Sequence, residues 1–435
     1  MACAPAFAQQ APQGDDTPAA PNDPQAALAD RDAESETVPL EEIRRYVAVF
    51  NMVREAYVEP VDDATLMQAA IRGLLHDLDP HSAYLEHEAS ENLAERTRGA
   101  YEGIGVDIVR QPDDTLKVIA PIDGTPAARA GIKPGDVIVA VDGRPLSGSS
   151  PDDDLLRGPP GSEVVLTVVR EDLDEPLDIP VVRDTIRVAS VRGRMLEPGY
   201  GYVRISMFQA DTGADFAAEL DRLSTEAGGA LEGLVIDVRS NPGGLLTTAV
   251  QVADELLDKG TIVTTRGRLA ISDSEFNATP GDKLKGAPLV VLVDAGSASA
   301  SEVLAGALGD NGRARIVGSR TFGKGSVQTV LPLDNGDSVK LTTARYYTPD
   351  GRSIQALGIV PDVVLHAEEG GDDGRPAGYT EADLPGHLGA EVPGDGDGEA
   401  LPGINAGEVL DGTRYIDAAL AELKRAAATA AAPSR

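Results

Sequence analysis

Serines and a lysine in two nearby segments have the residue types needed for nucleophilic catalysis. Asp294–Glu302 reads Asp-Ala-Gly-Ser-Ala-Ser-Ala-Ser-Glu, and Thr321–Gln328 reads Thr-Phe-Gly-Lys-Gly-Ser-Val-Gln. A serine nucleophile needs a base, and lysine can serve when burial lowers its pKa from about 10.4 to about 7–8. All five histidines lie outside residues 100–365, which disfavours a serine–histidine–aspartate relay. The two segments therefore indicate a Ser-Lys hydrolase.

The elements that must position these residues follow from local patterns. Residues 289–293 form an apolar run typical of a buried strand, and apolar residues at helical spacing predict a helix over 299–308. The serines then lie where a strand turns into a helix, as in a nucleophile elbow, although the Gly-x-Ser-x-Gly pattern is absent. The helix N-terminus would direct backbone N–H groups toward a developing oxyanion.

The lysine segment predicts a strand over 324–331. Side chains alternate along a strand, so Lys324, Ser326 and Gln328 should share one face. Gln328 would then orient the amine or hold the attacking water.

A second loop has the composition of an anion-binding turn. Asp237–Gly244 reads Asp-Val-Arg-Ser-Asn-Pro-Gly-Gly; it follows a predicted strand over 233–237 and precedes a helix that begins near Leu245. The adjacent glycines Gly243 and Gly244 allow the backbone to approach a ligand closely and turn its N–H groups inward. An ordinary Pro-Gly turn is the alternative.

Residues 99–184 have the pattern of a binding module. A glycine loop at Tyr101–Gly105 precedes an alternating strand that ends at Val109. The remaining predicted elements are a short helix over 125–132, a strand between two turns over 133–143, a second short helix over 152–157, and strands over 164–170 and 177–182.

Ordered blocks between about Leu40 and Pro361 resemble the C-terminal processing peptidases, tail-specific serine proteases that carry a PDZ domain. The blocks are Leu74–Leu85 (Leu-Leu-His-Asp-Leu-Asp-Pro-His-Ser-Ala-Tyr-Leu), Tyr101–Gly105, Asp237–Gly244, the serine and lysine segments, and Tyr346–Gln355. The resemblance implies an α/β protein whose crotonase-like α/β sandwich protease core carries an inserted β-rich PDZ domain and helical terminal segments.

The resemblance also implies roles for individual residues. Ser299 matches the nucleophile, Lys324 the general base and Gln328 the third catalytic residue. The oxyanion amides would come from Ala300 and from either Gly243 or Gly244. In the PDZ domain, the N–H groups of Gly103, Ile104 and Gly105 would bind a terminal carboxylate while the peptide adds a strand beside residues 106–109. Arg157 matches an arginine that couples the PDZ domain to the protease site in some relatives, although it could instead cap its helix.

These patterns divide the chain into consecutive parts. We expect a disordered remnant of an export signal and linker over 1–36, a helical segment over 37–98, the PDZ domain over 99–184, the serine protease core over 185–366, an acidic Gly/Pro-rich linker over 367–406 that carries no chemistry, and a C-terminal helix over 407–435.

Two other function classes fit the chain less well. Gly318–Lys324 matches the start of a phosphate-binding P-loop, but Gly325 stands where Ser or Thr should ligate magnesium, and a strand rather than a helix follows. The other alternative is a latent or inactive PDZ scaffold that binds C-terminal tails and requires a partner. The presence of Ser299, Lys324 and Gln328 favours an active endopeptidase that cleaves or degrades proteins without ATP, metal or cofactor.

Composition bounds the partners and the location. The net charge of −33 argues against nucleic acid as a partner and favours solubility.

Amphipathic patterns over 40–57, 65–78 and 409–429 predict terminal helices. Relatives use such helices to form homodimers; packing within the subunit is the alternative. An adaptor or activator protein is a further possible partner.

The N-terminal residues bear on the location of the protein. Ala6-Phe-Ala8 resembles a signal-peptidase site without the preceding basic and apolar regions, so we expect a periplasmic or otherwise exported protein whose signal is truncated. The single cysteine, Cys3, excludes an internal disulfide.

Overall fold

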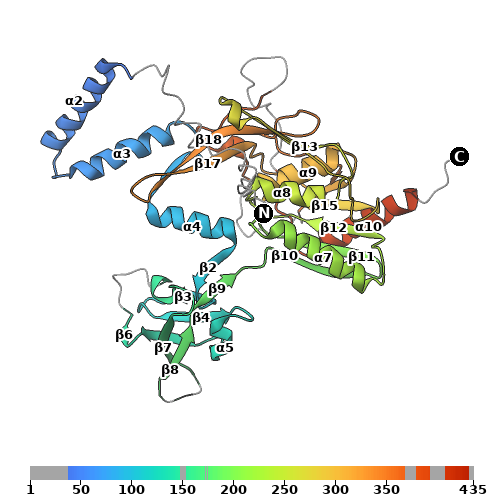
Figure 1. Cartoon of the computed structure of the whole chain (residues 1–435), viewed down its shortest axis with the longest axis horizontal. Helices are drawn as coiled ribbons and strands as arrows, with labels where there is room; N and C mark the ends of the chain where they lie inside the picture. The colour runs from blue at the N-terminus through green and yellow to red at the C-terminus, as the bar shows by residue number, and fades with distance from the viewer. Residues whose placement is uncertain are drawn as a thin grey trace, which may run out of the picture.

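The computed structural model describes residues 38–146, 153–171, 173, 175–367, 379–391 and 407–430. These residues form an N-terminal helical arm, a small β-rich module and a larger α/β body (Figure 1). Residues 1–37, which include Cys3 and the expected signal remnant, lie outside the described residues. Within the described part of the chain, no helix has the length and apolar character needed to cross a membrane.

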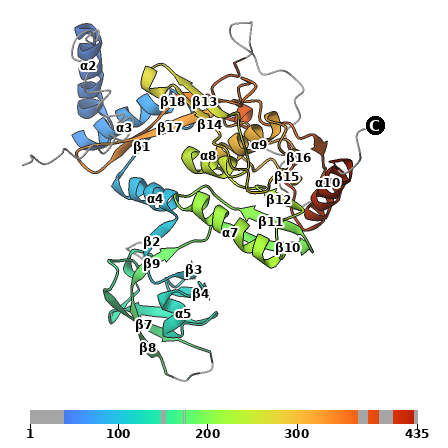
Figure 2. The same cartoon turned by 45° about the vertical axis from the view of Figure 1, so that its right-hand side comes forward.

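The arm begins with α2 (Leu40–Ala56) and α3 (Asp63–His76), close to the helices expected from the sequence. Asp62 caps α3, because its side chain accepts the N–H of Thr65 at 2.9 Å. The chain continues through β1 (Ala83–Leu85) and α4 (His87–Arg98). Helix α2 has no buried residue and stands away from the body in both views (Figures 1 and 2). Its apolar face therefore remains uncovered in the single chain.

The β-rich module is connected to the rest of the chain by β2 (Ala100–Gly103) and β9 (Asp184–Arg187), which pair antiparallel. Its sheet has the order β3-β4-β5-β7-β8, with β6 paired to β5. The elements are β3 (Val106–Arg110), β4 (Leu116–Pro121), α5 (Pro126–Ala130), β5 (Val137–Val141), β6 (Arg144–Pro145), α6 (Asp153–Leu156), β7 (Glu163–Val169) and β8 (Leu177–Val182). The module encloses its own core, which includes Ile104, Ile138 and Leu166.

The α/β body is built on a sheet with the order β10-β11-β12-β15-β16-β19. Its strands are β10 (Val191–Glu197), β11 (Tyr200–Ile205), β12 (Gly233–Asp237), β15 (Leu289–Val293), β16 (Arg315–Gly318) and β19 (Val363–Val364). From β11 to β19 the neighbouring strands run parallel. Strands β12 and β15 are buried at every position, as expected for a parallel sheet covered on both faces.

Side-chain alternation assigns the two faces of this sheet to different helices. Leu289, Val291 and Val293 pack with α7 (Thr212–Glu226), α8 (Leu246–Asp254) and α9 (Ala300–Asp310). Val290 and Leu292 pack on the other face against α10 (Arg414–Ala430), visible at the right of Figure 2. The C-terminal helix therefore completes the core of its own subunit.

A second sheet joins the arm to the body. It has the order β1-β18-β13-β14, with β17 also paired to β18. The body contributes β13 (Thr261–Gly267), β14 (Ser274–Asn277), β17 (Ser326–Pro332) and β18 (Ser338–Tyr347), and a short 3-10 turn, η1 (Ala270–Ser272), lies between β13 and β14. Because β1 pairs with β18, the residues just before β1 are brought against the body.

One expectation about the acidic segment is wrong. The sequence predicts an unstructured linker without chemistry over 367–406, yet residues 379–391 lie on the body and contain the 3-10 turn η2 (Glu381–Asp383). The side chain of Glu381 is fully buried there. Acidic and glycine-rich composition does not reveal that a carboxylate has buried hydrogen-bond partners elsewhere in the chain.

Candidate active site

Ser299 lies at the turn between β15 and α9, which is the strand–turn–helix arrangement expected from the sequence. Its backbone has φ 55° and ψ −115°, a conformation that non-glycine residues rarely adopt. The turn is held by Asp294, whose side chain accepts the N–H groups of Ser240 at 2.7 Å and Gly296 at 2.9 Å. Such strain persists only where surrounding contacts impose it, and it commonly marks functional positions.

Glu302 connects the serine segment to the lysine segment. Its fully buried carboxylate accepts the N–H of Ser299 at 2.8 Å, the Thr321 hydroxyl at 2.5 Å, the N–H of Gly323 at 2.7 Å and the N–H of Lys324 at 2.9 Å. Burial raises the pKa of Glu302 to about 7, and these hydrogen bonds work against the rise. The carboxylate therefore holds two catalytic candidates at fixed backbone positions.

Lys324 lies just before β17, which begins at Ser326 rather than at the lysine itself. Its Nζ donates to the carbonyl oxygen of Ser326 at 3.2 Å and to Oε1 of Gln328. The predicted contact among Lys324, Ser326 and Gln328 is therefore present, although a bulge interrupts the strand between Val327 and Gln328.

The surroundings of Lys324 favour its neutral form. Burial lowers the pKa of Lys324 from 10.5 to about 8. The nearby Lys340 lowers it further, whereas the carboxylates of Glu381, Glu302 and Asp79 oppose the shift. An amine with this pKa is partly neutral near pH 8 and able to accept a proton.

Ser299 and Lys324 are neighbours without direct side-chain pairing. Among the described residues, no hydrogen bond joins Ser299 Oγ to Lys324 Nζ, whose donors go to Ser326 and Gln328. Tyr346 lies beside Ser299; burial raises the pKa of Tyr346 to about 12, and a hydrogen bond with the Ser299 side chain opposes the rise.

The Pro-Gly-Gly loop touches the serine turn. A Cβ at Gly243 would lie 2.8 Å from Ser299 Cβ and 2.9 Å from the amide nitrogen of Ala300, and a Cβ at Gly244 would lie 2.1 Å from the carbonyl oxygen of Phe208. Both glycines also have positive φ. The lack of room for a Cβ atom and the backbone conformation therefore each require glycine at these positions.

Asn241 organises this loop and was not singled out from the sequence. The N–H of Gly243 donates to Asn241 Oδ1 at 2.9 Å, and Asn241 Nδ2 donates to the carbonyl oxygen of Ile205 at 2.9 Å. Asn241 is fully buried. The backbone N–H of Gly243 is therefore already hydrogen-bonded within the loop in this conformation.

The β-rich module carries a groove where a peptide-binding site is expected. A cavity of about 190 Å³ lies between β3 and the end of α6, lined by Tyr101, Ile104, Gly105, Val106, Asp107, Ile108, Leu156 and Arg157. Gly103 closes β2 next to it. Gly105 has φ 76°, and a Cβ there would lie 2.4 Å from Thr125 Cβ, so the turn into β3 requires glycine.

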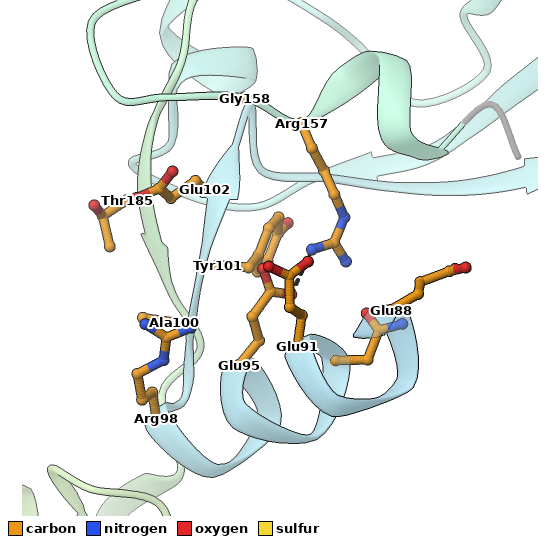
Figure 3. Close-up of a pocket in the computed structure, with 11 residues that line it drawn as sticks. Glu88, Glu91, Glu95, Arg98, Ala100, Tyr101, Glu102, Arg157, Gly158 and Thr185 are labelled. Carbon is orange, nitrogen blue, oxygen red and sulfur yellow. Dashed lines mark hydrogen bonds and ion pairs between the residues drawn. The ribbon is translucent and has the colours of Figure 1, made fainter. Parts of the chain in front are cut away.

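Arg157 connects this groove to the arm. Its guanidinium lies 5.3 Å from the ring centre of Tyr101 and pairs with Glu95 on α4. Figure 3 shows Glu91 and Glu95 extending from α4 toward Arg157, beside a larger cavity of about 610 Å³. The pair with Glu95 and the contact with the ring of Tyr101 therefore link Arg157 to α4 and β2.

Several residues near the lysine were missed because their partners are distant in sequence. Asp79, in the arm, accepts a hydrogen bond from Thr342 on β18 at 3.1 Å. His81 Nε2 lies 2.8 Å from an oxygen of Glu381. The only sequence signal for Asp79 and His81 was their position in the Leu74–Leu85 block, and nothing distinguished Glu381.

Comparisons with known proteins agree with this architecture. The model of peptidase family S41 matches residues 199–365, that of the PDZ domain matches residues 117–170, and that of the activating protease CtpB N-terminal domain matches residues 8–89. The chain is 44% identical over 327 residues to a carboxy-terminal-processing protease of Bartonella bacilliformis, covering 74% of this chain and 75% of the relative.

A second relative and one solved structure are also described as C-terminal processing proteases. The carboxy-terminal processing protease CtpA of Bacillus subtilis is 34% identical over 317 residues, covering 72% of this chain and 67% of that protein. The structure of a photosystem II D1 C-terminal processing protease is similar with 34% identity and a TM-score of 0.44, covering 76% of this chain and 94% of that one. The family model and the two sequence relatives show that the chain is a serine-type peptidase of family S41 and belongs to the carboxy-terminal-processing proteases.

Proposed function

We propose that the protein is a serine endopeptidase that captures free C-terminal tails with its PDZ domain and cleaves them with Ser299, Lys324 and Gln328, without ATP. The observation that carries this proposal is the environment of Lys324: burial lowers its pKa to about 8, and Glu302 ties its backbone to that of Ser299. A neutral amine next to a strained serine has the chemistry of a general base.

In the proposed reaction, neutral Lys324 accepts the hydroxyl proton as Ser299 Oγ forms a bond to the peptide carbonyl carbon. The N–H of Ala300 at the start of α9 and one N–H of the Pro-Gly-Gly loop stabilise the oxyanion. Gly244 is the better candidate for that second donor, since the Gly243 amide donates to Asn241. Protonated Lys324 then gives its proton to the leaving amine, and water, deprotonated by the same lysine, releases the acyl group.

Tail capture is proposed for the groove between β3 and α6. The N–H groups around Gly103, Ile104 and Gly105 would bind the terminal carboxylate, while the tail adds a strand along β3. The body is assigned to the crotonase-like α/β sandwich, because helices pack on both faces of its mostly parallel sheet and a second, antiparallel sheet begins just after Lys324.

A latent enzyme that awaits a partner is the second candidate. One observation favours it: among the described residues, no hydrogen bond joins Lys324 Nζ to Ser299 Oγ. A bound tail, an adaptor protein or homodimerisation through the uncovered face of α2 would then bring the amine to the hydroxyl. We also propose export to the periplasm, where carboxy-terminal processing proteases are typically found.

The test is cleavage of an unfolded protein with an apolar C-terminal tail, in EDTA and without ATP. Wild type and Ser299→Ala are compared on free and amidated tails. Cleavage that is lost in Ser299→Ala and weakened by amidation supports the active tail-recognising protease. Tail binding without cleavage by wild type supports the latent form, and cleavage that persists in Ser299→Ala contradicts the assignment of the nucleophile.

A further inference from the structure

We propose that Asp79 is a positioning residue that fixes the orientation of the Gln328 amide through the hydroxyl of Thr342. This inference rests on the proposed role of Lys324 as the base. Asp79 lies in the arm between α3 and β1, whereas Thr342 and Gln328 lie on the paired strands β18 and β17 of the body.

The direction of the hydrogen bonds follows from Asp79. Its side chain is 5% exposed, and it accepts bonds from the Thr342 hydroxyl at 3.1 Å and the Ser82 hydroxyl at 2.7 Å. Burial alone would raise the pKa of Asp79, but hydrogen bonds from Ser82, His81 and Thr342 outweigh it and hold the pKa below its usual value. An ionised carboxylate only accepts, so Thr342 must donate to it.

The hydroxyl of Thr342 then has no proton left for Gln328. Its oxygen can only accept, and it lies 3.1 Å from Gln328 Nε2, which donates. The amide nitrogen also donates to the Ser326 hydroxyl at 3.2 Å. Gln328 Oε1 is thereby left facing Lys324, and the charge on Asp79 determines which end of the amide meets the base.

This orientation matters because of how a neutral amine bonds. Neutral Lys324 has two N–H donors and one electron pair. The donors are used by Gln328 Oε1 and by the carbonyl oxygen of Ser326, so the electron pair is left for the nucleophile. With the amide reversed, Gln328 would donate to that electron pair and block the base.

The same part of the arm also supports the other side of the lysine. His81 Nε2 lies 2.9 Å from Glu381 Oε1, which accepts from Gln355 Nε2 at 2.9 Å. Gln355 Oε1 in turn accepts the N–H of Gly325, the residue after Lys324, at 2.9 Å. Residues 79–82 thus reach both the side-chain partner and the backbone of the lysine segment.

The test compares substitutions of Thr342, which transmits the effect. Thr342→Val keeps the shape and removes the hydroxyl, whereas Thr342→Ser keeps the hydroxyl. Thr343→Val is the matched control, because Thr343 is the next residue and its hydroxyl bonds to Thr329 at 2.8 Å instead. Thr342→Ala replaces the valine variant if that protein does not fold, and thermal unfolding is measured for each variant.

We expect Thr342→Val to lower kcat on a short peptide by about 10- to 100-fold, up to the lower limit of a full general-base contribution because the base is misoriented and not removed, with KM little changed. Thr342→Ser recovers most of the loss, and Thr343→Val stays close to the parent. The acidic limb of the kcat–pH profile moves to lower pH in Thr342→Val, because an amide N–H facing Lys324 disfavours the ammonium form. Of the other charged groups around Lys324, Glu381, Lys340 and Glu302 are not altered by the substitution, whereas Asp79 loses the hydrogen bond from Thr342 but keeps those from Ser82 and His81.

A double-mutant cycle separates positioning from general stability. If Thr342 acts through Gln328, Thr342→Val has no further effect on kcat in the Gln328→Ala background. An additive loss there, or a folded Thr342→Val with the activity and pH profile of the parent, overturns the inference. Loss of cleavage in Ser299→Ala, measured in parallel, keeps the proposed function intact in that event; activity retained in Ser299→Ala would instead reject the proposed function itself.

Discussion

The backbone N–H groups of Ser299 and Lys324 donate to the same atom, Oε2 of Glu302, at 2.8 Å and 2.9 Å. One buried carboxylate thus fixes the proposed nucleophile and the proposed base relative to each other, although no hydrogen bond joins their side chains within the described part of the chain. The backbone positions of the two residues therefore depend on the same side chain.

Substitution of Glu302 should affect activity and stability together. Glu302→Gln keeps the shape but has one acceptor oxygen, so its amide group would face N–H donors that the carboxylate now satisfies. Unsatisfied buried donors should lower the free energy of unfolding by about 1–3 kcal/mol. We expect kcat/KM to fall at least about 100-fold, because both reacting groups shift. Cleavage assays and chemical denaturation measure the two effects; Glu41→Gln on the exposed α2 is the control, and a fully active Glu302→Gln would contradict this role.

Cleavage should rise with pH through the ionisation of Lys324. Its pKa lies near 8, so the amine is protonated and inactive at lower pH and neutral at higher pH. The kcat/KM profile of a peptide substrate should therefore have an acidic limb with its midpoint near pH 8. Lys324→Ala should remove this limb together with most of the activity, and a midpoint near that of free lysine would show that the base is not buried during catalysis.

The contact between Arg157 and Glu95 should transmit tail binding to the arm. Arg157→Ala and Glu95→Gln each remove the pair, so both should reduce the preference for free over amidated tails. Cleavage of a short peptide that does not use the PDZ groove should change less. Arg129→Ala, whose side chain contacts Asp184 on the exposed surface, is the control. Unchanged tail preference in both variants would assign the pair a structural role only.

The arm should mediate self-association. Ile43, Val47 and Val53 on α2 are 45%, 46% and 37% exposed, although their spacing places them on one face. If a second subunit covers this face, Ile43→Asp with Val47→Asp should weaken the dimer at least about 10-fold, since charges would enter an apolar interface. Sedimentation equilibrium measures the change, with Arg44→Gln as the control. A monomeric wild type at micromolar concentration would exclude this assembly.

Much of the fold was predictable because its signals are local. The apolar run of β15 and the helical spacing in α9 depend on neighbouring residues, and the structure has both elements close to their expected positions. The order of elements in residues 99–184 was also predictable, since turns, glycines and alternating strands have short-range patterns. The prediction for the acidic segment was wrong. Its composition alone indicated a linker, but residues 379–391 contain Glu381, which is buried.

The sequence by itself determined which groups are available: a serine at a strand–helix turn, a lysine with a glutamine on the same face, and two glycines that let the backbone approach. Only the tertiary structure decided how those groups behave. Asp79 meets Thr342 across 263 residues and His81 meets Glu381 across 300, so neither contact has a local signature. Burial and hydrogen-bond direction arise from such long-range packing, and they set the pKa of Lys324 and the orientation of Gln328.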